Sequence, residues 1–306
     1  MHNAQPWMFR YLNGRCTMQL RGDPGRVMEK ADPQNRALHL GCGAALFNLR
    51  VAAARLGREP VTTLLPTPDD PWLFAEVRLD LPVRRESDLA ALHPAIRRRH
   101  TSRFPFTDEQ VPDAVLDGLR AAALLEGAQL HVPDAWHLQE LLSLIHDAES
   151  REALDPEVRE ELVRWTRTGP EDATTPKEGI PGRAFGPRQY DVTAPVRDFA
   201  AGRAVPGRDT AAFEKHPRLA LLGTDNDRPG DWLRAGQAME RVLLRATLDG
   251  LACSLTSQAL EWSELRWAVR DPVSAMGHVQ MVIRLGYGPA GPPTPRRRVS
   301  DVLEIV

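Results

Sequence analysis

Alternating apolar and polar side chains mark the first strand of this sequence. The run from Trp7 to Leu12 alternates, and the Asn13-Gly14 pair after it predicts a tight type I′ hairpin turn with a return strand over residues 16–20. Similar apolar runs predict more strands, at residues 61–65, 74–79, 220–224 and 279–285.

Two long helices rich in glycine and alanine are predicted at residues 38–56 and 236–248. Small residues let another backbone approach closely, and each helix is followed by a glycine, Gly57 or Gly250, that suits a C-cap. Other helical patterns lie near residues 112–125, 135–149 and 156–165.

The two glycine-rich helices share one register. Four small residues of the first match four of the second at a constant offset, 236 − 43 = 193. The pairs are Gly43 with Gly236, Ala45 with Ala238, Ala53 with Ala246, and Gly57 with Gly250. An alternating strand follows each helix, so we interpret the chain as an internal duplication.

Composition excludes several classes of protein. The 306 residues include 42% hydrophobic and 26% charged side chains, as in a globular protein, and the net charge of −2 gives no general attraction to nucleic acid or anionic membranes. The three cysteines show no metal-site spacing, so buried free thiols in the cytoplasm are expected. We find no signal peptide, and we expect no apolar run to be long enough to span a bilayer.

One long stretch, residues 168–208, has no clear period. It is rich in proline, glycine and charge, and it has too few apolar residues in register to predict a core of its own. Loops of this length are usually a lid over a site or a linker.

Two polar motifs are candidates for binding. In the first, Asn3 and Gln5 carry amides that can donate and accept in one plane, and Pro6 is expected to hold the preceding backbone extended. Such amides suit a flat heterocycle, but a polar loop capped by a core Trp7 has the same residue types. In the second, residues 97–103 hold arginines that suit a phosphate, or form a solvated basic face.

The first motif resembles a known family. Asn3-x-Gln5-Pro6-Trp7 before a strand resembles the flavin-contacting loop of the nitroreductase family, and the preceding His2 resembles its Acg-like subgroup of two fused halves. The resemblance implies an α+β fold of antiparallel-rich sheets flanked by helices, a tandem pseudo-dimer with halves at residues 1–95 and 96–306. The family's usual Ala-Pro-Ser-type stretch and helix before the loop are missing here.

The resemblance also implies a cofactor, FMN, and the residues that hold it. His2, Asn3 and Gln5 would contact the flavin, while the backbone around Ser257 and Gln258 would face its reactive edge. The phosphate would be held by arginines and a threonine near residue 100 and after the last strand, namely Arg99, Thr101, Arg103, Arg296 and Arg297. Only one complete set of these contacts is present, which implies one FMN per chain.

The resemblance therefore implies a monomeric, NAD(P)H-dependent FMN oxidoreductase that reduces small nitroaromatic or quinone-like acceptors. Two alternatives remain open. Residues 168–208 would cover the flavin in an FMN-sequestering protein with little turnover, or the missing lead-in would leave a protein that binds no flavin. No nucleophile-base pair, P-loop or GxGxxG motif supports hydrolysis or a Rossmann fold.

Overall fold

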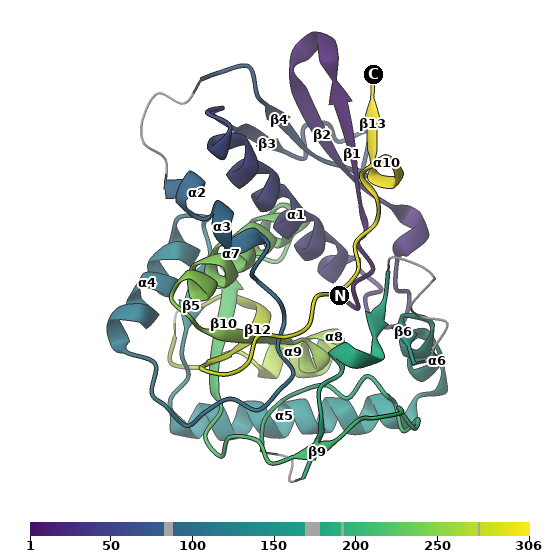
Figure 1. The fold of residues 1–306 in the computed structure, drawn as a ribbon, viewed down its shortest axis with the longest axis vertical. Helices are drawn as coiled ribbons and strands as arrows, with labels where there is room; N and C mark the ends of the chain where they lie inside the picture. The colour runs from purple at the N-terminus through teal and green to yellow at the C-terminus, as the bar shows by residue number, and fades with distance from the viewer. Residues whose placement is uncertain (83–87, 169–177, 191–192, 275) are drawn as a thin grey trace.

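Two antiparallel-rich sheets and a central pair of helices make up this α+β chain. The computed structural model describes residues 1–82, 88–168, 178–190, 193–274 and 276–306. The central helices are α1 (Arg36–Arg55) and α7 (Pro229–Leu248), which cross in the middle of the molecule (Figure 1).

The first sheet has the strand order β13-β1-β2-β4-β3. All of its pairings are antiparallel except that of β13 with β1, so the last strand of the chain completes the sheet that the first strand begins (Figure 1). The strands are β1 (Trp7–Leu12), β2 (Thr17–Gly22), β3 (Val61–Leu64), β4 (Leu73–Arg78) and β13 (Leu303–Ile305). Apolar side chains of this sheet and of α1 form one core cluster around Leu20, Leu46 and Phe74.

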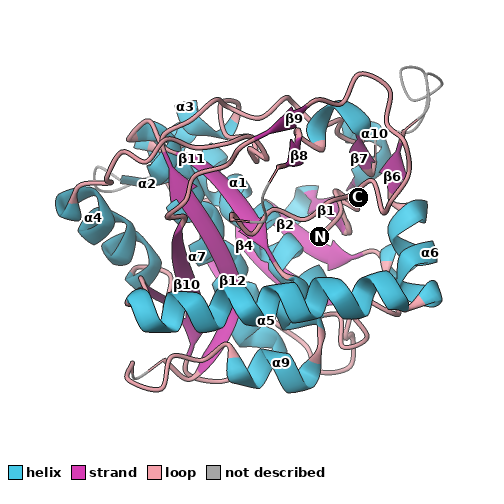
Figure 2. Cartoon of the chain, turned by 90° about the horizontal axis from the view of Figure 1, so that it is seen from below, coloured by secondary structure: helices cyan, strands magenta, loops and turns pink. Residues whose placement is uncertain are grey.

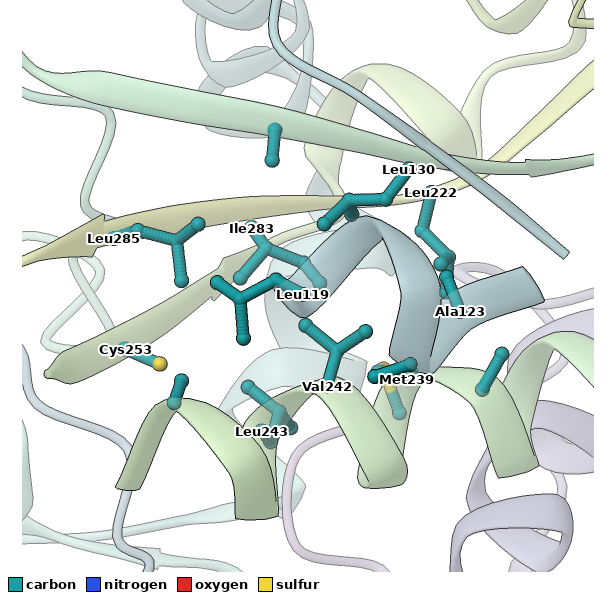
Figure 3. Close-up of a cluster of buried hydrophobic side chains, with 14 of the residues drawn as sticks. Leu119, Ala123, Leu130, Leu222, Met239, Val242, Leu243, Cys253, Ile283 and Leu285 are labelled. Atoms are coloured by element: carbon teal, nitrogen blue, oxygen red, sulfur yellow. The ribbon is translucent and has the colours of Figure 1, made fainter. Parts of the chain in front are cut away.

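The second sheet has the strand order β11-β12-β10-β5 and is antiparallel throughout. Its strands are β5 (Gln129–His131), β10 (Arg218–Thr224), β11 (Ala252–Thr256) and β12 (His278–Gly286). One face packs on α7 and on α4 (Asp113–Leu124), where Leu119, Val242 and Ile283 meet in the largest core cluster (Figure 3). The other face packs on the long helix α5 (Ala135–Leu154), which crosses in front of the strands in Figure 2.

The remaining elements are short. The helices are α2 (Asp88–Ala91), α3 (His93–Ile96), α6 (Pro156–Arg164), α8 (Gln258–Glu261), α9 (Ser263–Ala268) and α10 (Val299–Val302). Two-residue strands pair β6 (Thr166–Arg167) with β7 (Ile180–Pro181), and β8 (Arg188–Gln189) with β9 (Thr210–Ala211).

Most predicted elements are confirmed within a few residues, but three details were wrong. The first hairpin turns through a 3-10 helix, Asn13–Arg15, and Cys16 takes the left-handed conformation, so the two-residue turn is replaced by a longer one. Cys16 is exposed, whereas Cys42 and Cys253 are buried as expected. Helix α1 is long and apolar enough to meet a membrane-span criterion, although 61% of that apolar window is buried inside the protein.

The aperiodic segment also differs from expectation. Its described residues pack a small core of their own, in which Ile180, Phe185 and Phe199 surround Leu162 of α6. The sequence did not predict this core because its apolar residues lie in turns and short loops, so they are not spaced with the period of a helix or a strand. The predicted boundary between two halves at residue 95 remains a prediction.

Candidate functional site

A cavity of about 220 Å³ lies where the N-terminal loop, residues 99–103, the two central helices and the aperiodic segment meet. It brings together eight of the ten predicted site residues, His2, Asn3, Gln5, Arg99, Thr101, Arg103, Ser257 and Arg296. These residues come from distant parts of the sequence, so the fold itself assembles the cavity.

The N-terminal loop enters the cavity in a strained conformation. His2, Asn3 and Gln5 have φ angles of 47°, 54° and 52°, in the left-handed region that side chains other than glycine rarely adopt. The expectation that Pro6 would hold Gln5 extended was therefore wrong. Such strain persists only where surrounding contacts impose it, and it is concentrated at functional sites. Here Arg26 Nη1 donates to the carbonyl of Ala4 at 2.8 Å.

The amides of this loop bind mainly to the protein. Asn3 Nδ2 donates to the carbonyl oxygens of Gly179 and Pro295 at 3.0 and 3.1 Å, and its Oδ1 accepts from Arg296 Nη1 at 3.0 Å. Gln5 Oε1 accepts from the backbone N–H of Arg297 at 2.8 Å. Asn3 thus ties the aperiodic segment and the C-terminal arginines to the cavity wall.

His2 presents one unpaired ring nitrogen. Its side chain is buried, and burial together with the nearby charge of Arg197 holds its pKa well below the ordinary value, so the ring is neutral at pH 7. Its Nδ1 lies 3.2 Å from Met28 Sδ, which can only accept, so Nδ1 carries the proton. Nε2 is then an acceptor, and it has no partner in the described part of the chain.

The arginines near residue 100 are held by different partners. Arg99 forms an ion pair with Glu240, whose Oε1 lies 3.2 Å from Arg99 Nε and accepts from Asn48 Nδ2 at 3.0 Å. Arg103 donates to the carbonyl of Ala184 at 2.9 Å, and burial lowers its pKa to about 10. Arg99 is thereby fixed to the central helix pair, and Arg103 to the aperiodic segment.

Backbone contacts fix the segment between these arginines. Thr101 forms an isolated parallel bridge with Cys253 of β11, and the backbone N–H of Ser102 donates to the Cys253 carbonyl at 2.8 Å. Gly291 packs against this segment so closely that a Cβ there would lie 3.1 Å from Ser102 Cα. The arginine side chains on either side therefore start from a rigid backbone.

Two predicted residues lie outside the cavity. Gln258 Nε2 donates to Glu149 Oε1 at 3.0 Å. The guanidinium of Arg297 lies 3.3 Å from Asp23 Oδ2 and 2.9 Å from the carbonyl of Asp301. Arg297 still contacts the N-terminal loop at Gln5, where its backbone N–H donates to Oε1 at 2.8 Å and its Nη1 donates to the backbone carbonyl at 3.3 Å.

Three residues of the cavity wall were missed from the sequence. Glu240 is buried in the middle of α7, and a carboxylate among its apolar neighbours is the signal that would have found it. Arg197 and Phe199 lie in the aperiodic segment, where no period singles out an inward side chain. Arg197 pairs with Glu152 and Glu261 at 2.7 Å each, while the Phe199 ring lies under Arg103 at 4.7 Å.

Comparison with known proteins identifies the chain. The nitroreductase family model matches residues 96–287. The protein of Mycobacterium tuberculosis H37Rv named "Putative NAD(P)H nitroreductase Rv3131" is 33% identical over 99% of this chain and 87% of its own length. This chain belongs to the nitroreductase family. The same organism's "Putative NAD(P)H nitroreductase acg" is 31% identical over 100% of this chain and 91% of its own, which confirms the resemblance to the Acg-like subgroup.

Solved nitroreductases are also similar to this family member. The FMN-dependent nitroreductase NfnB of Mycobacterium smegmatis, solved in complex with NADPH, has a TM-score of 0.43 and 16% identity over 70% of this chain and 97% of its own. A nitroreductase of Bacteroides fragilis with bound FMN has a TM-score of 0.40 and 16% identity over 68% of this chain and 94% of its own.

Proposed function

We propose that this nitroreductase binds one FMN in the cavity and uses NAD(P)H to reduce a small nitroaromatic or quinone-like acceptor. The observation that carries the proposal is the convergence of Arg99, Arg103 and Arg296 on the cavity that the His2–Gln5 loop also lines. Guanidinium groups bind phosphate bidentately, which suits the phosphate end of FMN.

The charges of the wall fit an anionic cofactor. Arg99 faces Glu240, and Arg197 is neutralised by two carboxylates. Arg103 and Arg296 have no ion-pair partner among the described residues, so they bring uncompensated positive charge to the wall. A bound dianionic phosphate would provide that compensation.

The loop fits the other end of the cofactor. When bound, FMN supplies the hydride chemistry, and the protein contributes binding, orientation and electrostatics. The neutral imidazole of His2 can accept a hydrogen bond through Nε2. The strained backbone of residues 2–5 holds that acceptor in place.

A difference across the central helix pair supports one flavin per chain. Under the offset of 193 residues, Asn48 corresponds to Arg241 and Phe47 to Glu240. Glu240 lines the cavity and accepts from Asn48, whereas their counterparts stack on each other, with the Arg241 guanidinium 5.8 Å from the Phe47 ring centroid. Arg241 also pairs with the buried side chain of Glu126 at 2.7 Å. The second site of a fused dimer would thus be filled by side chains, and a monomer is the expected state.

The test is an anaerobic spectrum of the FMN-loaded protein before and after addition of NADPH or NADH. Bleaching of the flavin absorbance, followed by its recovery when a nitroaromatic or quinone is added, supports the oxidoreductase. Flavin that binds but stays oxidised with both donors contradicts it.

A second candidate, an FMN-sequestering protein, is favoured by how the aperiodic segment covers the cavity. Phe199 packs edge-on against His2 at 5.5 Å, and Gly179 accepts from Asn3. Glu178 forms an ion pair with Arg26. The cavity of about 220 Å³ is smaller than pockets for drug-sized ligands, which are roughly 300 Å³ or more, so the segment must shift to admit a flavin.

A further inference from the structure

A second cavity, of about 410 Å³, borders the first turn of α1. Its walls come from the loop before α1, from α9 and from the start of β12, and it shares no lining residue with the proposed FMN cavity. Nothing in the proposed oxidoreductase mechanism uses it.

The carboxylates of this cavity are already bound to the protein. Asp32 caps α1, accepting from the backbone N–H groups of Ala37 and Leu38 at 3.0 and 2.8 Å. Asp227 accepts two bonds from Arg266, at 2.7 and 2.6 Å. Glu261 pairs with Arg197. These acids are therefore poorly placed to attract a cation, because each already has its partner.

Arg36 lines the cavity with its charge unpaired. The residue is only 4% exposed, and Nη1 donates to the backbone carbonyl and to Oε1 of Gln280, at 2.6 and 3.2 Å. Within the described residues no carboxylate forms an ion pair with Arg36, and its Nε and Nη2 make no hydrogen bond. Burial and the neighbouring Arg266 lower its pKa to about 10.

A buried guanidinium without a carboxylate partner is costly, because its desolvation is not offset by an opposite charge. Gln280, which holds Arg36, also accepts from Arg266 at 3.1 Å, so two guanidinium groups converge on one amide oxygen. A third, Arg270, lines the same cavity from an exposed position and has no ion-pair partner in the described part of the chain. The three arginines give the cavity positive charge, and Arg36 adds N–H donors that no group of the described residues accepts. An anionic ligand would supply the missing acceptor.

We propose that this cavity binds a small oxyanion, a carboxylate or phosphate group of a soluble metabolite, through the free N–H groups of Arg36. A guanidinium offers parallel donors that match two oxygens of either group. The exposed ring of Trp267 also lines the cavity, so it offers a surface for a planar part of the same ligand.

The test titrates the protein with benzoate and with inorganic phosphate by calorimetry, in a chloride buffer. Wild type should bind at least one of them, and Arg36→Gln should weaken that binding roughly 10-fold or more, the usual effect of losing a charge-assisted hydrogen bond. Arg245→Gln is the matched control, because it removes the same charge from an exposed pair with Asp249. If Arg36→Gln loses the binding of benzoate, the natural ligand carries a carboxylate group. If it loses the binding of phosphate, the natural ligand carries a phosphate group.

Two further variants separate this site from the FMN cavity and from a structural role. Arg36→Gln should leave FMN binding unchanged, because Arg36 does not line the FMN cavity, whereas Arg270→Gln should weaken the anion binding several-fold. Arg36→Met should melt no lower than wild type, because it removes an unpaired buried charge. Absence of binding of both anions by wild type at millimolar concentration, or equal binding by wild type and Arg36→Gln, overturns the proposal.

Discussion

Gly43 and Gly236 face each other where α1 crosses α7. A Cβ built on Gly43 would lie 3.0 Å from the Cα of Gly236, and one on Gly236 would lie 2.9 Å from the Cα of Gly43. Two residues that share the 193-residue offset in the sequence thus lie at a contact between the helices that leaves no room for a side chain on either. Across the same helix pair Asn48 donates to Glu240, which lines the proposed FMN cavity.

Adding one methyl group at this crossing should separate the helices. We expect Gly43→Ala to lower the free energy of unfolding by about 1–3 kcal/mol, the usual cost of overpacking a core. Gly118→Ala in α4 is the control, because its nearest foreign atom would be 3.9 Å away, and alanine there should stabilise the helix by about 0.5–1 kcal/mol. Denaturant unfolding measures both, and a Gly43→Ala variant as stable as wild type would show that the helices tolerate more separation.

The proposed binding of the FMN phosphate by Arg99, Arg103 and Arg296 gives a prediction for neighbouring arginines. Arg99→Ala should weaken FMN binding roughly 10- to 100-fold, the loss of about 1.5–3 kcal/mol from one charged hydrogen bond. Arg97→Ala should have little effect, because Arg97 is exposed after α3 and does not line the cavity. Arg99→Ala also leaves Glu240 without its arginine partner, which by itself lowers stability. Arg296→Gln breaks no ion pair, so it tests phosphate binding without that effect. Fluorescence titration measures all three, and equal small effects would make residues 97–103 a solvated basic face.

The elements were predictable wherever local pattern sets them. The glycine and alanine run of α1 and the alternation of β12 depend on nearby residues only, and both elements formed within a few residues of the predicted bounds. The turn after β1 was not predictable in the same way, since Cys16 enters the left-handed region that Asn-Gly usually supplies.

The site was predictable only in part. The opening motif and the arginines near residue 100 are short local signals, and the fold brings them to one cavity. Arg197 and Phe199 reach that cavity from a segment without period, so only long-range packing selects them. The motif did not predict the role of the Asn3 amide correctly in detail, because its Nδ2 donates to backbone carbonyls of the protein.

Glu149 predicts a pH dependence of stability. Burial and the nearby Glu152 raise its pKa to about 7, above the ordinary value of 4.5. The folded state therefore holds a proton that the unfolded state releases, so the stabilisation is complete below pH 4.5 and is lost as pH rises through 7. Between pH 5 and pH 8 we expect wild type to lose roughly 1–3 kcal/mol more than Glu149→Gln. The exposed Glu140→Gln on the same helix should behave like wild type, and parallel curves for all three would contradict the account.

The aperiodic segment covers the cavity, so a substitution at Phe199 should change the rate at which NADPH reduces the flavin. Phe199→Ala removes the ring that packs on His2 and under Arg103, so nicotinamide should reach the cavity more easily. If the protein sequesters FMN, stopped-flow bleaching by NADPH should be several-fold faster in the variant, with FMN affinity nearly unchanged. A slower reaction in the variant would instead make Phe199 part of the substrate site.

The most direct test of the central claim is a titration of the purified apo-protein with FMN, followed by flavin fluorescence and by absorbance after removal of free ligand. The account predicts saturation at one FMN per chain, with binding weakened in Arg99→Ala and Arg296→Gln and retained in Arg97→Ala. Saturation at two FMN per chain, or no binding at all, would contradict it.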